Sequence, residues 1–118
     1  MAADKEDKTQ IRDIKDLIPD VKKTQAYFIV ISGKHVGSMY KVSKDEMYIG
    51  RVGDADILIE DDGVSRQHAK VERAPNGSIR IVDLESTNGT FFNGARINEH
   101  VLRDGDKVQI GSTTILKF

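Results

Sequence analysis

The amino-acid sequence predicts an all-β fold, an antiparallel two-sheet β-sandwich preceded by a short N-terminal extension. From Ala26 onward the chain consists of short β-branched, aromatic or alternating runs, such as "AYFIVIS", "EMYIGR" and "SIRIVDL". Nearly every junction between these runs carries Gly, Asn-Gly or Asp-Gly, which tolerate the positive φ of tight turns. About nine to eleven strands with turn signals every eight to twelve residues favour two sheets packed face to face.

The first 25 residues have a different character, because they are rich in Lys and Asp and contain no glycine. They offer one short helical pattern before Pro19, in which apolar residues recur at spacings of three and four: Ile11, Ile14, Leu17 and Ile18. We therefore predict a flexible tail with a short helix over residues 1–25 and one sandwich domain over residues 26–118. An isolated helix this short rarely persists in water, so it is either solvated, packed on the flank of the domain, or a docking or regulatory segment.

Composition excludes several classes of function. The chain has 118 residues, the size of one domain, and its 18 basic and 19 acidic residues give a net charge of -1. No general attraction to nucleic acid or to anionic lipid follows from that charge, and no apolar run approaches the length of a membrane span. Cysteine is absent and the three histidines have no metal-ligand spacing, so we expect no metal site, no cofactor and a cytoplasmic location.

Polar side chains concentrate in three predicted turns. Arg51 follows the run "MYIG", Ser65 and Arg66 follow "DILIEDDG", and Thr87 and Asn88 follow "IVDLES". If the strands run up and down, these turns meet at one end of the sandwich. Guanidinium groups offer a planar fork of donors for phosphate or carboxylate, and short hydroxyls and amides fill the remaining oxygen sites. The pattern predicts a site for a phosphate-like dianion.

The ordered set of motifs resembles the forkhead-associated (FHA) domain over residues 26–118. The motifs are "GR" at 50–51, "SRQH" at 65–68, "DLESTNGT" at 83–90, "NG" at 93–94, "LRDGD" at 102–106 and Gly111. The resemblance implies an eleven-stranded sandwich that binds phosphothreonine peptides through loops at one end. It implies that the phosphopeptide is bound by Arg51, Ser65, Arg66, Thr87 and Asn88. It further implies that the loops are shaped by Gly50, His68, Gly89 and Asn93.

We therefore expect a phospho-dependent adaptor in serine/threonine kinase pathways and not an enzyme. Its partner would be a phosphothreonine-containing protein, a kinase or a kinase substrate. One alternative is an enzyme with Ser65 as nucleophile, His68 as base and Asp83 as orienting group, although the elbow motif of such enzymes is missing. Another is an FHA-like scaffold that binds a protein partner independently of phosphate.

Two further segments of the sequence suggest sites. The acidic run Glu60-Asp61-Asp62 lacks the oxygen spacing of an EF-hand loop and favours a solvated acidic turn over a calcium site. Thr9 and Thr24 are candidate phosphorylation sites in the tail, because several bacterial FHA proteins have a phosphorylated threonine on an N-terminal extension that folds back into its own pocket. Thr9 is favoured, since Thr24 lies only two residues before the first strand.

Overall fold

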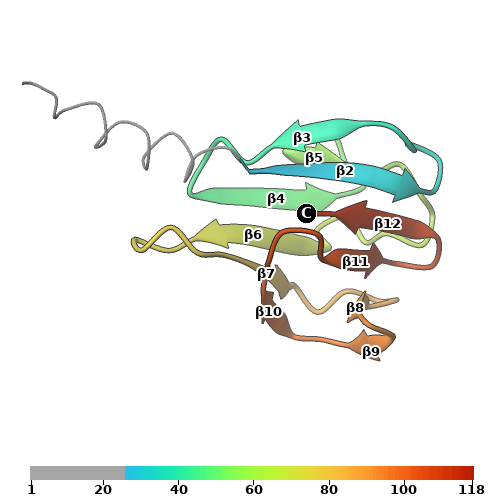
Figure 1. The fold of residues 1–118 in the computed structure, drawn as a ribbon. Helices are drawn as coiled ribbons and strands as arrows, with labels where there is room; N and C mark the ends of the chain where they lie inside the picture. Colours follow the sequence, from blue (N-terminus) through green and yellow to red (C-terminus); the bar gives the residue numbers. More distant parts are fainter. Residues whose placement is uncertain (1–25) are drawn as a thin grey trace, which may run out of the picture.

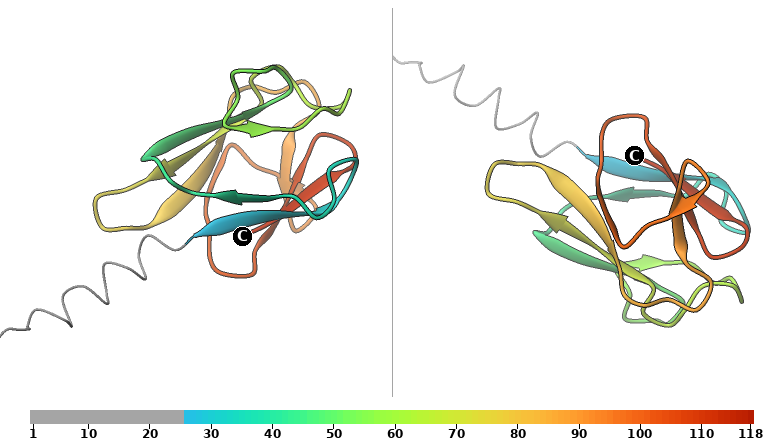
Figure 2. Two further views of the ribbon diagram at one scale, coloured as in Figure 1. Left: turned by 90° about the horizontal axis from the view of Figure 1, so that it is seen from above. Right: turned by 90° about the horizontal axis from the view of Figure 1, so that it is seen from below.

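The computed structural model describes residues 26–118, which form two β-sheets packed face to face (Figures 1 and 2). The five-stranded sheet has the order β10 (Glu99–Val101), β7 (Ile79–Asp83), β6 (Ala69–Arg73), β4 (Glu46–Gly50) and β5 (Ile57–Leu58). The six-stranded sheet has the order β3 (Met39–Lys41), β2 (Tyr27–Ser32), β12 (Thr114–Lys117), β11 (Lys107–Ile110), β8 (Thr90–Phe92) and β9 (Ala95–Arg96). The predicted eleven-stranded sandwich is confirmed.

Strand pairing differs from the prediction in one place. The pairings between described strands are antiparallel, except that β4 and β5 run parallel, with Ile49 opposite Ile57 and Gly50 opposite Leu58. The loop between them brings the chain back so that β5 runs in the same direction as β4. A hairpin turn would have made the pair antiparallel. The loop that holds Arg51 is therefore fixed between two strands of one sheet.

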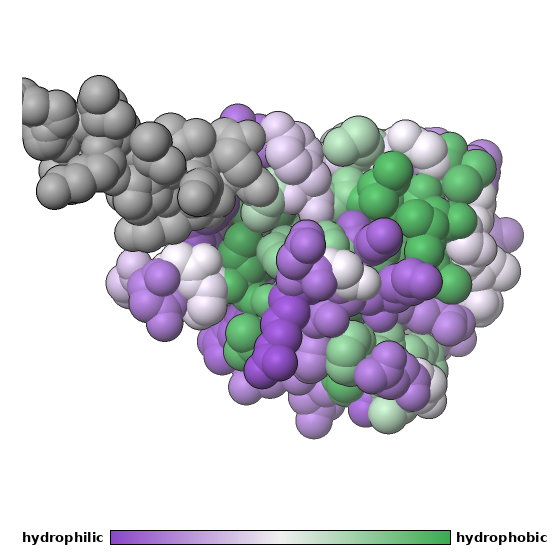
Figure 3. Space-filling view, in the orientation of Figure 1, coloured by the Kyte–Doolittle hydropathy of each residue, from purple (hydrophilic) through white to green (hydrophobic). Residues whose placement is uncertain are grey.

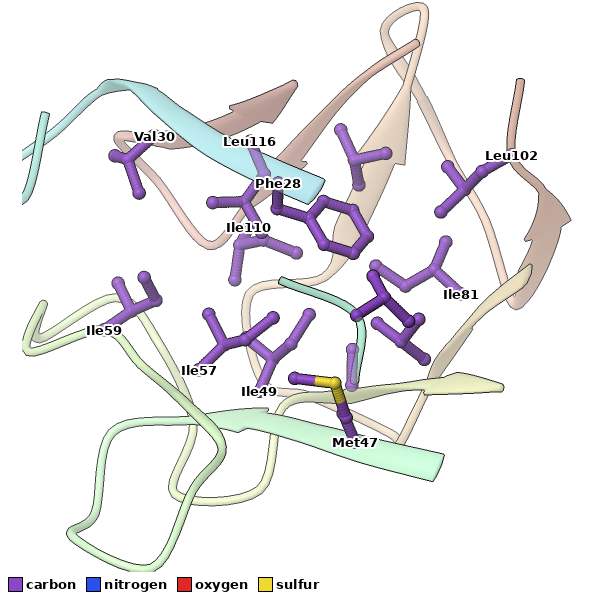
Figure 4. Packing of buried hydrophobic residues seen from close by; sticks show 14 of the residues in the cluster. Phe28, Val30, Met47, Ile49, Ile57, Ile59, Ile81, Leu102, Ile110 and Leu116 are labelled. Atoms are coloured by element: carbon purple, nitrogen blue, oxygen red, sulfur yellow. The ribbon is translucent and has the colours of Figure 1, made fainter. Parts of the chain in front are cut away.

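The core lies between the two sheets, where alternate residues of each strand point inward. In β2, Phe28 and Val30 are buried while Tyr27 and Ile31 are exposed. Figure 4 shows Phe28 projecting from the six-stranded sheet toward Met47, Ile49 and Ile81 of the five-stranded sheet. This apolar layer holds the two sheets together, so the loops at the ends of the strands are attached to a rigid scaffold.

The outer face of the five-stranded sheet is charged. Lys70 of β6 forms ion pairs with Glu72 at 2.8 Å and with Glu46 at 3.3 Å. Arg80 of β7 forms ion pairs with Glu72 at 2.7 Å and with Glu99 of β10 at 3.1 Å. One of these pairs, Lys70–Glu72, lies within β6, and the others join neighbouring strands, so charges of both signs are paired across β4, β6, β7 and β10.

Several predictions concern residues that the structure does not describe. The helical pattern at 11–18 and the candidate phosphorylation sites Thr9 and Thr24 lie outside the described residues. Within residues 26–118, no helix has the length and apolar character needed to cross a membrane.

Candidate functional site

Three loops from the five-stranded sheet meet at one end of the sandwich, which we call the apex. It is formed by the loop after β4 (51–56), the loop before β6 (59–68) and the loop after β7 (84–89). β4 and β7 both run antiparallel to β6, so the C-terminal ends of the outer two strands lie beside the N-terminal end of the middle one. In Figure 1 this end is on the right.

Arg51 is attached to the neighbouring loop by its backbone and by one side-chain nitrogen. Its backbone N–H donates to the carbonyl oxygens of Ser65 and Arg66, both at 3.2 Å. Its Nε donates to the carbonyl oxygen of Val64 at 2.8 Å. The side chain is otherwise exposed, and its two terminal nitrogens have no hydrogen bond to another described residue. The guanidinium is thus oriented by its inner nitrogen while its outer donors face solvent.

Ser65, Thr87 and Asn88 connect two of the loops. The backbone N–H of Thr87 donates to Ser65 Oγ at 3.0 Å, so the serine hydroxyl still has its own proton to donate. Asn88 Nδ2 donates to the carbonyl oxygen of Gly63 at 2.9 Å. The structure therefore brings these three predicted residues together, and their mutual contacts fix the spacing between the loops.

Arg66 lies at the same end but on the flank of the apex. Its side chain is exposed, and it borders a hollow of about 310 Å³ together with Tyr48 and Asp54. Neither Arg66 nor Arg51 has a carboxylate partner among the described residues. In contrast to the paired outer face, the apex therefore presents two guanidinium groups without a carboxylate of residues 26–118 within ion-pair distance, and their donors can bind an anion.

His68 is fully buried and bridges two loops beneath the apex. Its Nδ1 accepts a hydrogen bond from the backbone N–H of Ser65 at 3.0 Å. Since Nδ1 is an acceptor, Nε2 carries the proton and donates to the carbonyl oxygen of Gly89 at 2.9 Å. Burial is the main reason that the pKa of His68 is lowered, so the neutral ring is the stable form. This geometry fits a loop-shaping role for His68.

The other candidate loop-shaping residues occupy positions with a steric requirement. A Cβ at Gly50 would lie 1.9 Å from the carbonyl oxygen of Arg66, so a side chain there would separate β4 from the loop. Gly89 has a φ of +92°, a conformation that L-residues rarely adopt. Asn93 has a φ of 53° and forms, with Gly94, the turn between β8 and β9. Asn93 therefore belongs to that hairpin, whereas Gly50 and Gly89 lie at the loops of the apex.

The sequence analysis missed a polar network that holds the loop after β7. The carboxylate of Asp83 accepts hydrogen bonds from Ser86 Oγ at 2.6 Å, Ser86 N at 3.1 Å and Thr90 Oγ1 at 2.7 Å. Ser86 Oγ in turn accepts from the backbone N–H of Gly89 at 3.0 Å. Burial alone would raise the pKa of Asp83, but the hydrogen bonds from Ser86 and Thr90 outweigh it and lower the pKa. The motif "DLESTNGT", which is rich in hydroxyl side chains, was the sequence signal for this hydrogen-bond network.

Arg96 and Glu85 are two further features of this loop that the sequence did not indicate. Arg96 of β9 donates from Nη2 to the carbonyl oxygen of Ser86 at 2.8 Å, although it lies ten residues away. Glu85 has a φ of 57° without being glycine, so the loop is held in an uncommon backbone conformation next to Thr87. Both features indicate a loop whose shape is set in advance of any ligand.

The geometry does not form the catalytic relay of the enzyme alternative. Nδ1 of His68 faces the backbone N–H of Ser65 and its Nε2 faces a carbonyl, so neither nitrogen is placed to take the serine hydroxyl proton. The carboxylate of Asp83 is used by Ser86 and Thr90 instead of by the ring.

Within the acidic run, Glu60 and Asp62 are exposed as expected, but Asp61 is a structural link and not simply solvated. The Asp61 carboxylate accepts hydrogen bonds from the hydroxyl of Thr113, from Thr114 Oγ1 at 3.1 Å and from Gly63 N at 2.9 Å. The bond from Thr113 is the main reason that the pKa of Asp61 is lowered. Asp61 thus connects the apex to the turn between β11 and β12, 52 residues along the chain.

Sequence comparison links this arrangement to characterised proteins. The FHA domain model matches residues 47–111, which include all three apex loops. The chain is 38% identical over 86 residues to the glycogen accumulation regulator GarA of Mycolicibacterium smegmatis, covering 73% of this chain and 54% of the relative. It is 39% identical over 83 residues to the oxoglutarate dehydrogenase inhibitor of Corynebacterium diphtheriae, covering 70% of this chain and 57% of the relative. The chain thus spans a little over half the length of these relatives.

Solved structures share the fold. An FHA domain studied for its phosphothreonine-dependent interactions has a TM-score of 0.67 and 31% identity, over 79% of this chain and 97% of that one. The FhaA FHA domain, solved in complex with the intracellular domain of another protein, also has a TM-score of 0.67 and 31% identity, over 78% of this chain and all of that one.

Proposed function

Because the chain belongs to the forkhead-associated domain family, we propose that its apex binds phosphothreonine peptides and that it acts as a phospho-dependent adaptor. The observation that carries this proposal is the pair of guanidinium groups, Arg51 and Arg66, without carboxylate partners among the described residues. Arg51 and Arg66 lie at the same end of the sandwich as Ser65, on loops that are already fixed to one another. A phosphate with close to two negative charges and three acceptor oxygens matches these donors.

The role of each apex residue follows from the hydrogen-bond donors that its contacts within the protein leave free. The terminal nitrogens of Arg51 donate to the phosphate, and the hydroxyl of Ser65 donates through its free proton. The hydroxyl of Thr87 completes the phosphate contacts, and Arg66 adds charge from the flank. Asn88 is fixed by Gly63 through one proton of its amide, which leaves the other proton and the carbonyl for the peptide backbone.

Charge-assisted hydrogen bonds are worth roughly 1.5 to 3 kcal/mol each. Two or three of them lost with the phosphate would cost about 3 to 8 kcal/mol, or several orders of magnitude in affinity. Binding should therefore depend on phosphorylation, and an unmodified peptide should not bind measurably. The main-chain contacts of Asn88 alone cannot compensate for that loss.

The partners follow from the same chemistry. They are phosphothreonine-containing proteins of a serine/threonine kinase pathway, either the kinase or its substrates, and we place the protein in the cytoplasm with them. The relatives are named as a regulator of glycogen accumulation and an inhibitor of oxoglutarate dehydrogenase. By analogy, this chain controls an enzyme through binding and performs no catalysis itself.

The tail supplies an intramolecular ligand in this proposal. Thr9 lies seventeen residues before Ala26, and a chain of that length has a root-mean-square reach of roughly 20 to 25 Å. Phosphorylated Thr9 would thus compete with partners at an effective concentration near millimolar. Ligation of phosphothreonine at position 9 should shift the amide resonances of Arg51, Ser65 and Asn88 at any protein concentration. Shifts that grow with concentration would contradict intramolecular capture.

A phosphothreonine peptide library, with every member paired to its unmodified twin, tests the main proposal by calorimetry. We expect measurable binding only for phosphorylated members. If modified and unmodified peptides bind equally, the domain is a scaffold that binds partners independently of phosphate, and the proposal is wrong.

A further inference from the structure

A groove lies at the base of the sandwich, where the described chain begins. Its volume is about 520 Å³, and its apolar lining includes Ile29, Met39, Ile79, Leu102 and Phe118. We call it the base groove. Ala26 and Tyr27, the first described residues, also line it. Because β2 runs from the base to the apex, this groove and the phosphopeptide loops lie at opposite ends of the domain (Figure 1).

The groove leaves large apolar side chains in solvent. Met39 is 60% exposed and Tyr27 is 40% exposed, on strands that pair directly with each other. Figure 3 shows hydrophobic surface beside the grey atoms that precede residue 26, in contrast to the hydrophilic surface around it. The outer face of the other sheet presents paired charges instead. An apolar hollow of this kind is a candidate docking surface.

The segment that fits this hollow by sequence is residues 11–18 of the same chain. Its apolar residues recur at spacings of three and four, so they would share one face of a helix: Ile11, Ile14, Leu17 and Ile18. Ile18 and Ala26 are eight positions apart in the sequence, and a fully extended chain spans up to roughly 26 to 29 Å over eight residue steps. Since Ala26 itself lines the groove, the tether is long enough for the segment to turn back onto it.

Charged residues of both signs occur in the groove and in this segment. Asp104 and Lys117 lie among the lining residues and are exposed. The segment contains both signs beside its apolar residues, with Lys15 and Asp16 between Ile14 and Leu17. A tethered segment also has an effective concentration near millimolar, which a second copy or a separate partner of similar chemistry does not reach at ordinary protein concentrations.

We propose that residues 11–18 dock as an amphipathic helix into the base groove, with Ile14 and Leu17 against Met39 and Phe118. Docking requires no phosphate and uses no residue of the apex. It covers the exposed apolar side chains at the base and determines where the tail leaves the domain. It therefore goes beyond phosphopeptide binding and is tested separately from it. Because Thr9 lies two positions before Ile11 and the groove and the apex are at opposite ends of the domain, docking and capture of phosphorylated Thr9 exclude each other, so the docked state is that of the unphosphorylated tail.

Disulfide trapping in the full chain tests the proposal, because the chain contains no cysteine of its own. The test variant combines Leu17→Cys with Met39→Cys. One control moves the tail cysteine to the opposite face of the helix, as Asp16→Cys with Met39→Cys. The other keeps Leu17→Cys and pairs it with Val36→Cys, which is 63% exposed but lies in the turn between β2 and β3 at the apex end.

We expect the Leu17–Met39 pair to form an intramolecular disulfide roughly tenfold faster than either control, at a rate independent of protein concentration. Equal rates in all three variants would overturn the proposal. Disulfide-linked dimers whose yield rises with concentration would also overturn it, in favour of a second copy in the groove.

A second measurement avoids cysteine altogether. Leu17→Asp should shift the amide resonances of Tyr27, Met39 and Phe118 in the full chain, whereas Asp16→Lys, on the opposite face of the helix, should not. Shifts of equal size in both variants would contradict docking. Phosphopeptide affinity, measured on the same samples, should be unchanged in both variants. If the Leu17–Met39 disulfide forms no faster than those of the controls while phosphopeptides still bind, the docking proposal is wrong and the assignment of the apex stands.

Discussion

At the scale of single residues, Arg51 combines a fixed position with free donors. The bond from its Nε to Val64 orients the guanidinium, while the terminal nitrogens remain available. A side chain oriented before binding loses less conformational entropy when the ligand arrives. The same bond makes Arg51 distinct from Arg66, whose side chain has no hydrogen-bond or ion-pair partner among residues 26–118 and supplies charge without a fixed direction.

Arg51→Ala should therefore abolish phosphopeptide binding. Two lost charge-assisted hydrogen bonds are worth about 3 to 6 kcal/mol, or roughly 10² to 10⁴ in affinity. Stability should fall by only about 1 kcal/mol or less, because the residue is exposed. Calorimetry and thermal unfolding measure the two effects. Arg103→Ala, an exposed arginine at the base, is the matched control and should bind like the unmodified protein. Retained affinity in Arg51→Ala would reject the pocket assignment.

His68 joins two loops through its neutral ring, and this creates a pH dependence. Burial is the main reason that the pKa of His68 in the folded protein lies below the ordinary histidine value of 6.5. The unfolded chain therefore takes up a proton near pH 6.5 that the folded protein does not, and the stability contributed by His68 is fully present above pH 6.5. It is lost progressively as the pH falls from there toward the pKa of the folded state.

We expect the free energy of unfolding to decrease between pH 7.5 and pH 5.5, with His68 contributing a slope of up to about 1.4 kcal/mol per pH unit. Urea unfolding at several pH values measures this slope. His68→Gln keeps polar atoms near Ser65 and Gly89 but cannot titrate, so its slope should be shallower than that of the unmodified protein. Identical slopes would mean that other groups carry the whole pH dependence.

At the scale of elements, the connection between β7 and β8 is a rigid unit. Asp83 at the end of β7 and Thr90 at the start of β8 are joined by a hydrogen bond of 2.7 Å, and Ser86 between them contacts both Asp83 and Gly89. Arg96 contacts this unit from the next hairpin. Thr87 and Asn88 lie between Ser86 and Gly89 in this unit, so their position depends on the turn that Gly89 forms with its positive φ.

Gly89→Ala should damage both stability and binding. A Cβ there would meet Arg96 Nε at 2.9 Å in a backbone conformation with φ +92°. A left-handed conformation costs an L-residue roughly 1 to 2 kcal/mol, and the displaced loop would also weaken phosphopeptide binding. Gly53→Ala is the matched control, because no atom lies within 4 Å of its added Cβ and its φ is not in the positive range. Thermal unfolding of the two variants should differ clearly, and equal melting temperatures would contradict the requirement at Gly89.

At the scale of the whole molecule, both sheets contribute to the apex. The three site loops belong to the five-stranded sheet, but Asp61 ties them to Thr113 and Thr114 at the start of β12 in the other sheet. Gly111 N also donates to the carbonyl oxygen of Gly89 at 3.1 Å. The binding surface therefore forms only when the sheets are packed on each other, and binding is linked to global folding.

A phosphothreonine peptide should accordingly stabilise the entire domain. At a free peptide concentration one hundred times Kd, the free energy of unfolding should rise by about 2.7 kcal/mol, with an increase of several degrees in Tm. Thermal unfolding with and without peptide measures this effect. Neither the unmodified peptide nor the Arg51→Ala variant should show the rise. A stabilisation by the unmodified peptide would indicate binding independent of phosphate.

The local features of this protein could be predicted from its amino-acid sequence. Alternation and β-branched residues indicated the strands, and Asn-Gly and Asp-Gly pairs indicated the turns, because both depend on interactions within a few residues. The convergence of Arg51, Ser65 and Thr87 was also predictable, since antiparallel neighbours place successive turns at known ends of a sheet. The buried role of His68 followed from its place at the start of an alternating strand.

The features that depend on contacts between distant segments could not be predicted from the sequence. These are the parallel pairing of β4 with β5, the bond from Arg96 to Ser86, the hydroxyl partners of Asp61 and the base groove. Each one joins groups whose separation is set by how the two sheets pack and twist, and no local pattern specifies that packing. A polar side chain such as Asp61 therefore appeared solvated in the sequence, although the packed sheets bring two hydroxyls to its carboxylate.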